Sequence, residues 1–218
     1  TEGFGLKSFP VTYQMIDLIR GSMLLFLLAI ITFFAGVLVW KERESRLDEV
    51  FDALPHPTWI MYIGKTFSLT LILLIFLTLG AISGVTAQAL QGYTRFQPLL
   101  YITELLGLDM FRMFCLIVLA MICHVLAPNK YMGYFLFVLV VIADAFGRSM
   151  LDIQTHLVNF GGLPAYTYSD MYGFAPYTQG LWVFTGFWLL FATLVSVAAI
   201  LLWQRGRETQ LRQRLSTA

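Results

Sequence analysis

Charged residues gather in one short segment of the chain, residues 41–65. The chain has 14 basic and 13 acidic residues, and nine of these charged residues lie in this segment. The flanking stretches 21–40 and 66–94 hold no charged residue. Ionisable side chains are costly inside a bilayer, so a charged segment between two uncharged apolar stretches belongs at a membrane surface. There its side chains are available to a partner protein or to lipid headgroups, which makes the segment the first candidate for function.

The central part of this segment, residues 44–54, has the periodicity of a short amphipathic helix. Its apolar residues fall at i, i+3, i+4 and i+7, one stripe of a helix, and Pro55 ends it because residues before a proline avoid the helical region. Acidic side chains favour a protein partner, since helices that seek anionic lipid are rich in Lys and Arg. A helix that only seats the bundle at the interface is the alternative. The residues expected to contact a partner are Arg46, Leu47, Asp48, Glu49, Phe51, Asp52 and Leu54.

Two pairs of opposite charge fall in or beside apolar stretches. Asp144 and Arg148 are four residues apart, and Asp109 and Arg112 are three apart. Each pair shares one face of a helix and can form an ion pair. Ionisable residues within a span also mark substrate pathways, so a structural ion pair and a gate both stay open for each pair.

The sequence carries no catalytic motif. It contains neither an HExxH zinc motif nor a GxxxxGK[ST] phosphate-binding loop. Ser83 and His124 lie towards opposite sides of the membrane, which disfavours a serine–histidine dyad, and His124 is expected to be a hydrogen-bonded core residue. Cys115 and Cys123 are separated by roughly 12 Å along a helix, beyond disulfide reach. We expect no enzyme activity, metal or cofactor in this chain.

Composition places the chain in a membrane. It is 58% hydrophobic and 12% charged, whereas soluble domains are about 25% charged. A bilayer core needs about 20 apolar residues of helix, and five stretches approach or exceed that length. We therefore predict an all-α, polytopic transmembrane bundle in a single domain, residues 1–218, taken from a longer polypeptide. The predicted spans are residues 21–40, 64–90, 111–126, 131–150 and 181–203.

The segments between the spans differ in kind. Residues 91–110 include LLYITELLGL, whose helical periodicity predicts a helix along the outer interface. The long connection 151–180 is rich in Gly, Pro and Tyr and predicts a structured aromatic cap. Small residues let helices approach closely, so four glycines are expected at helix contacts: Gly36, Gly80, Gly84 and Gly133.

Basic residues set the predicted orientation, because cytoplasmic loops carry an excess of Lys and Arg. With five spans, nine basic residues fall on one face and five on the other. The face with nine is predicted to be cytoplasmic, which puts the N-terminus outside and the C-terminus inside. The nine are Lys41, Arg43, Arg46, Lys65, Lys130, Arg205, Arg207, Arg212 and Arg214.

The loop VWKERESRLDEVFDALPHPTWIMYIGK resembles the first cytoplasmic loop of type-2 ABC exporter permeases, in which a short coupling helix precedes Leu-x-x-Pro and a Gly-Lys pair. It is more narrowly similar to the subfamily whose permease is fused to a zinc aminopeptidase domain. The sequences LLWQRG and YSDMYGF resemble that subfamily too, although Tyr172 stands where the motif has Asn. The resembling residues are Trp40, Glu42, Arg43, Asp48, Asp52, Ala53, Leu54, Pro55 and Lys65 in the loop, and Tyr168, Ser169, Asp170 and Gly173 later.

The resemblance implies the second permease half of an exporter in the bacterial inner membrane, without the peptidase. Its partners would be a cytosolic ABC ATPase subunit, which binds ATP and Mg²⁺, and the other permease half or a second copy. Membrane lipid would surround it, and no nucleic acid is implied. ATPase-driven motion would pass through residues 44–54 and alternate substrate access. The alternative is a non-transporting membrane anchor or mechanical-signalling module that positions a fused peptidase or partner protein.

Overall fold

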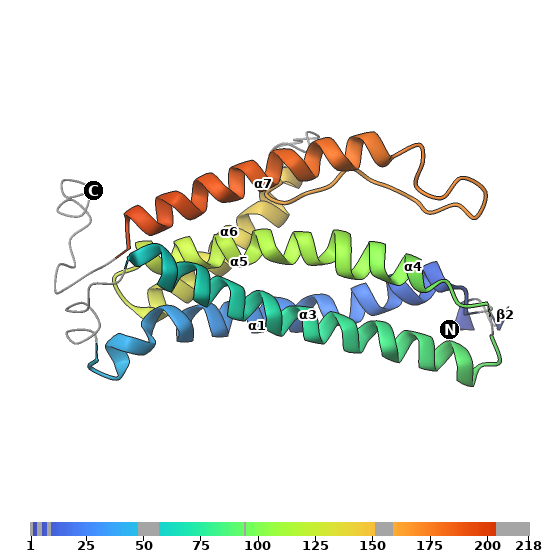
Figure 1. Cartoon of the computed structure of the whole chain (residues 1–218), viewed down its shortest axis with the longest axis horizontal. Helices are drawn as coiled ribbons and strands as arrows, with labels where there is room; N and C mark the ends of the chain where they lie inside the picture. The colour runs from blue at the N-terminus through green and yellow to red at the C-terminus, as the bar shows by residue number, and fades with distance from the viewer. Residues whose placement is uncertain are drawn as a thin grey trace.

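Long helices lie side by side along most of the described chain (Figure 1). The computed structural model describes residues 2–3, 6–7, 10–47, 57–93, 95–150 and 159–203. Two short strands, β1 (Glu2–Gly3) and β2 (Leu6–Lys7), pair antiparallel before the first helix. The helices are α1 (Thr12–Glu44), α3 (Thr58–Leu90), α4 (Pro98–Tyr101), η1 (Ile102–Asp109), α5 (Met110–Leu126), α6 (Lys130–Met150) and α7 (Thr178–Leu201). The predicted all-helical class is therefore confirmed.

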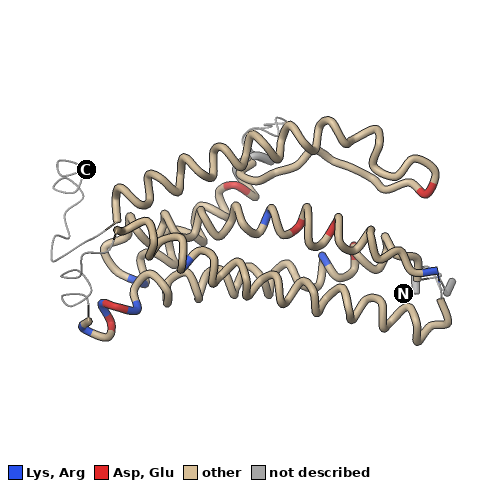
Figure 2. The backbone as a smooth tube through the Cα atoms, in the orientation of Figure 1, with Lys and Arg blue, Asp and Glu red and all other residues tan. Residues whose placement is uncertain are grey.

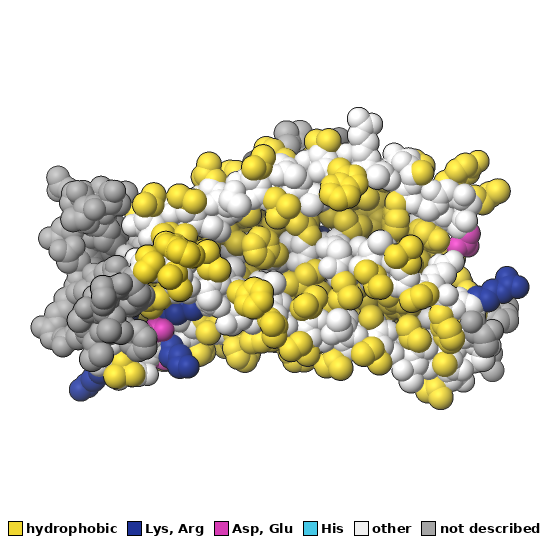
Figure 3. Space-filling view, viewed as in Figure 1, with side chains coloured by type: hydrophobic (Ala, Val, Ile, Leu, Met, Phe, Trp, Pro, Cys, Tyr) yellow, Lys and Arg dark blue, Asp and Glu magenta, His cyan; other side chains and the backbone are white. Residues whose placement is uncertain are grey.

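Four helical segments are long and apolar enough to cross a membrane: α1, α3, the continuous segment Pro98–Leu126, and α7. Figure 3 shows apolar side chains over the middle of one face and charged side chains towards its two ends. That surface suits a chain whose middle is solvated by hydrocarbon and whose ends reach water. Among the described residues, α6, the predicted fourth span, is not one of the four crossing helices.

Helix α1 extends beyond the predicted span 21–40 at both ends, whereas α3 begins before the predicted span 64–90 and ends with it. Each has 33 residues, roughly 50 Å of helix, against about 30 Å of hydrocarbon. Helix α3 begins directly after Pro57, because proline is tolerated ahead of a helix but not inside it. Helix α1 begins at Thr12 and includes Arg20, which finds acidic partners within the bundle.

The predicted interfacial helix over 99–108 is instead the first part of a long segment inside the bundle. Here α4, η1 and α5 follow one another without a gap, and η1 is a π-helix. Leu100, Tyr101 and Leu105 are buried in a cluster with Met15, Ile16 and Ile19 of α1. The segment packs inward because its carboxylates meet Arg20, a partner that a lipid interface does not offer.

After α6, the chain returns along α7 as extended backbone (Figure 1). The Phe160 ring lies 5.4 Å from that of Trp188, in the middle of α7, and the Trp188 indole N–H donates to the Gly162 carbonyl at 3.0 Å. Gly161 has a φ of 71° and lies against Cys115 of α5. Non-helical backbone at such depth is tolerated where it is buried in protein. The predicted aromatic cap therefore begins inside the bundle rather than above it.

The four predicted glycine contacts are confirmed. A Cβ atom at any of these positions would lie closer than 3 Å to a side chain of another helix, so glycine sets the spacing of the helices. Cys115 and Cys123 are buried and free, as expected. The glycine contacts are Gly36 with Tyr134, Gly80 with Met23, Gly84 with Ile19 and Tyr101, and Gly133 with His124.

The contact of Gly133 with His124 can be tested by adding one methyl group. Gly133→Ala would push a Cβ into the imidazole ring, and overpacking of this kind costs about 1–3 kcal/mol. The matched control is Gly64→Ala in α3, where nothing lies within 4 Å of the added Cβ and the higher helix propensity of Ala is worth up to about 1 kcal/mol. In detergent, we expect Gly133→Ala to lower the melting temperature by several degrees and Gly64→Ala to hold or raise it. Equal melting temperatures would contradict the packing.

Candidate functional site

Arg20 of α1 is the centre of an ionic network inside the bundle. Its Nε donates to both carboxylate oxygens of Asp109, at 3.0 and 2.9 Å. Its Nη2 donates to Glu104 Oε2 at 2.8 Å and to the Tyr166 hydroxyl oxygen at 3.2 Å, and its Nη1 donates to Asp17 Oδ1 at 2.9 Å. One guanidinium therefore joins α1, η1 and the extended segment that follows α6.

The two carboxylates from η1 are buried, whereas the third is not. The Glu104 and Asp109 side chains are 6% and 7% exposed, and that of Asp17 is 69% exposed. A buried charge without a partner is strongly destabilising, so the two η1 carboxylates depend on Arg20. The basic residue Arg112 of α5 also acts electrostatically on Asp109.

Tyr166 brings the extended segment into the network. Burial raises the pKa of its phenol to about 12, against an opposing effect of Arg20. The hydroxyl therefore keeps its proton at physiological pH and accepts from Arg20 as a neutral group. This contact fixes the extended segment to α1 without adding a fourth negative charge.

The structure bears differently on the two residue pairs for which an ion pair and a gate were both left open. An ion pair of Asp109 with Arg112 was one of these alternatives, but both carboxylate oxygens of Asp109 accept from Arg20, on another helix. Asp144 lies half-buried beside a cavity of about 360 Å³ between α5, α6 and α7. The side chain of Arg148 lies outside the described residues, so that pairing stays a prediction.

A second set of charges lies at the end of the bundle where α1 stops and α3 starts, here called the basic end (Figure 2). Lys65 donates to Glu42 at 2.6 Å, and its ammonium lies 5.1 Å from the centre of the Trp203 ring, just beyond α7. Lys130, at the start of α6, donates to Glu44 at 2.9 Å. The basic end thus ties together α1, α3, α6 and the residues after α7.

The first residues of the segment 44–54, where a coupling helix is predicted, do not start a new helix. Helix α1 runs through Glu44, and the chain turns at Arg46, whose φ is 52°. That left-handed conformation breaks the helical path and leaves Leu47 exposed at the surface. Most of the predicted contact residues lie outside the described part of the chain: Asp48, Glu49, Phe51, Asp52 and Leu54.

The YSDMYGF motif forms a tight turn at the opposite end of the bundle. Ser169 and Gly173 exchange backbone hydrogen bonds of 3.3 and 2.7 Å, and Gly173 has a φ of 57°, which favours glycine. Asp170 accepts from the Gln97 amide at 3.5 Å, and Tyr168 packs against the apolar cluster formed with α1. The motif therefore fixes the two long connections of this end to each other.

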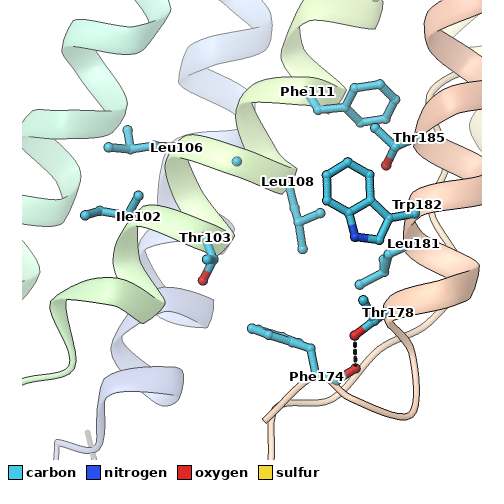
Figure 4. A pocket seen from close by; sticks show the side chains of 11 residues that line it. Ile102, Thr103, Leu106, Leu108, Phe111, Phe174, Thr178, Leu181, Trp182 and Thr185 are labelled. Carbon is cyan, nitrogen blue, oxygen red and sulfur yellow. Dashed lines mark hydrogen bonds between the residues drawn. The ribbon is translucent and has the colours of Figure 1, made fainter.

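A groove of about 580 Å³ opens between η1 and α7 (Figure 4). Leu106, Phe111 and Trp182 are among the apolar side chains that line it. The Thr103 hydroxyl donates to the Leu99 carbonyl of α4, and the Thr178 hydroxyl donates to the Phe174 carbonyl in the turn before α7. The groove is therefore suited to an apolar group.

Ser83 and His124 have separate surroundings. The Ser83 hydroxyl donates to the Gly80 carbonyl at 2.7 Å in α3. His124 is buried against Gly133, and its ring meets that of Tyr134 edge-on at 5.1 Å. The expected hydrogen bond of His124 is not formed within the described part of the chain. Its environment is that of an apolar core residue.

No protein-family model, curated protein or solved structure matches this chain. The two charged assemblies differ in kind. The basic end joins the helix termini on either side of residues 48–56, which suits a contact with a partner. The Arg20 network joins buried elements to one another, which suits a positioning role.

Removing Arg20 tests how much the network contributes to stability. Arg20→Gln leaves Glu104 and Asp109 buried without the cation that hydrogen-bonds to both, which should cost about 3–5 kcal/mol. The control Asp17→Asn removes an exposed partner of the same guanidinium, worth about 0–1 kcal/mol. Unfolding in detergent, followed by circular dichroism, should show a large loss for the first variant and almost none for the second. Similar losses of stability in the two variants would show that the buried contacts of Arg20 do not stabilise the fold more than its exposed contact.

Proposed function

We propose that this chain is a transmembrane half of an ATP-driven exporter, with residues 44–54 as its contact with a cytosolic ATPase subunit. Closure of the ATPase would displace the adjoining ends of α1 and α3. Their displacement would change the packing of the bundle and alternate access for a substrate. Nucleotide would be bound by the partner and not by this chain.

The convergence of residues at the basic end supports this proposal most directly. Glu42 comes just before the candidate contact, Lys65 follows it, and Trp203 lies in the LLWQRG sequence. These three side chains meet in one place. All three belong to sequences that resemble exporter permeases, so the resemblance extends to residues that are distant in the chain but close in space. A contact helix based there would act on three helices at once.

The two long helices suit the transmission of such a movement. Helices α1 and α3 are each continuous over 33 residues and reach from the basic end to the opposite end. Leu27, Ile31 and Ala35 of α1 are buried in one core with Leu69 and Leu73 of α3. Close packing makes such cores stiff, so displacement at one end would be carried along the bundle.

The proposal includes the cytoplasmic orientation of the basic end and a fifth crossing that contains α6. Lys41, Arg43, Lys65 and Lys130 lie at or near the basic end, in keeping with the positive-inside rule. Arg20 and Arg112, which were assigned to the outer face, instead belong to the buried network or adjoin it. Their removal from the count strengthens the asymmetry.

Charge and shape changes in the contact test the proposed partner. We expect Leu47→Asp, and separately Asp48→Lys with Glu49→Lys, to abolish co-purification of Mg²⁺-ATPase activity with the affinity-tagged protein from native membranes. An apolar anchor and an acidic edge would both be lost, while membrane insertion would be unchanged. The measurement is ATP hydrolysis in the eluate, normalised to the tagged protein.

Arg95→Glu, at the opposite end of the bundle, is the matched charge-changing control and should retain the ATPase. ATPase activity that survives both contact variants would exclude the proposed site. Retained co-purification in the wild type without any ATP-dependent movement of substrate in vesicles would favour the anchor or signalling alternative.

Cysteine labelling tests the orientation. Ser45 and Arg95 are exposed at opposite ends of the bundle, and the native Cys115 and Cys123 are buried. In intact cells, a membrane-impermeant maleimide should label Arg95→Cys and should label Ser45→Cys only after permeabilisation. The reverse pattern would overturn the orientation and remove the cytosolic partner.

A further inference from the structure

The π-helix η1 is unusual in its length, and its geometry points to a reason. π-Helices occur mostly as single turns and frequently at functional sites, whereas η1 runs for eight residues. The two buried carboxylates of the Arg20 network, Glu104 and Asp109, are both in η1 and are five residues apart. A π-helix closes its hydrogen bonds between residues five apart, so their side chains share one face.

An ordinary α-helix would separate these carboxylates. At 3.6 residues per turn, side chains five residues apart point about 140° away from each other. Only one of them could then reach Arg20. The π register presents both carboxylates to Arg20 together. In the same arrangement, the Tyr101 hydroxyl donates to Gln88 at 3.0 Å.

We propose that η1 is a two-register element, held in the π register by Arg20 binding Glu104 and Asp109 at the same time. Release of Glu104 lets the segment wind into the α register. Changing the register by one residue turns α4 by about 100° relative to α5. The Tyr101–Gln88 hydrogen bond is given up in that turn.

The surroundings of η1 determine what the change of register would move. On the other side of η1, Ile102, Thr103 and Leu106 line the groove that faces α7. Gln97, just before α4, donates a hydrogen bond to Asp170 in the tight turn of the YSDMYGF motif. The change of register would therefore reshape the groove and shift that turn, and α5 would stay in the core formed with α1 and α3. The inference does not depend on an ATPase partner.

Distances between spin labels test the proposal. One pair joins Leu99→Cys in α4 to Leu90→Cys at the end of α3, both at exposed positions. A reference pair joins Leu25→Cys in α1 to Leu79→Cys in α3. We expect Glu104→Leu to shift or split the first distance by up to about 8 Å, the chord of such a turn at side-chain radius, and to leave the reference distance unchanged. Asp17→Asn, which removes a partner of Arg20 on α1 itself, should change neither distance. An unshifted first distance in Glu104→Leu, with the reference distance intact, would overturn the proposal.

Deletion of one residue gives a second test, whose first readout requires no change at Glu104. When Gly107 is deleted, the separation of Glu104 and Asp109 becomes four residues, and that of Tyr101 and Asp109 becomes seven residues. An α-helix then presents these three side chains on one face. We expect this deletion to be tolerated, with the melting temperature and the reference distance retained, and to make the Leu99–Leu90 distance insensitive to Glu104→Leu.

The matched control is deletion of Gly186 from α7, a glycine where nothing lies within 4 Å of an added Cβ. That deletion turns Trp188 away from Gly162, and we expect it to unfold α7 or to lower the melting temperature markedly. If deletion of Gly107 is as damaging as deletion of Gly186, η1 is not a two-register element.

Discussion

The structure depends on one electrostatic constraint, which is that carboxylates buried among membrane-spanning helices need a cation within hydrogen-bonding distance. Arg20 meets that need through two nitrogen atoms, because Nε donates to Asp109 and Nη2 donates to Glu104. To do so, α1 must begin early enough to include Arg20, and α4 and η1 must lie in the bundle rather than along the interface. A π register is also required, because an α-helix would turn one carboxylate away. Three features of the fold thus follow from a single set of contacts.

The sequence predicts much of the fold and little of this network. Apolar stretches and turn-forming prolines predict where the helices lie, and small residues predict the glycine contacts, because these signals are local. The spacing of Asp109 and Arg112 in one helix indicated a possible ion pair or gate, but it could not reveal the hydrogen-bonded partner of Asp109, which is 89 positions away. The π register has no simple periodic signal in the sequence, because the buried positions Leu100, Tyr101, Glu104, Leu105 and Asp109 include the three- and four-residue spacings of an ordinary α-helix.

The basic end was predicted more fully than the network, because its charges stand out against apolar neighbours. Even there, spacing alone could not show that Glu42 and Lys65 bind each other across the loop that they enclose. A short ion pair at the base of a loop holds the exit of α1 beside the entry of α3. Whatever residues 48–56 contact, a force applied to them would reach both helices through this base. That property is shared by the exporter and by the signalling alternative, so only the partner and the substrate separate them.

The two ends of α1 are held in physically different ways, and this difference bears on how the bundle could move. Towards the basic end, α1 is held by the packing of Gly36 against Tyr134, by a long hydrogen bond of 3.4 Å from the Tyr134 hydroxyl to the Phe33 carbonyl, and by two ion pairs. The carboxylates of those ion pairs, Glu42 and Glu44, are 20% and 53% exposed, so water can replace a bond that a small displacement breaks. At Arg20, directional hydrogen bonds connect α1 to η1 and Tyr166, and rotation there requires bonds to break. A displacement of the basic end would therefore turn α1 about Arg20 before it separated the helices at that point. The Arg20 network would act as the pivot, and the register of η1 would decide whether the pivot holds.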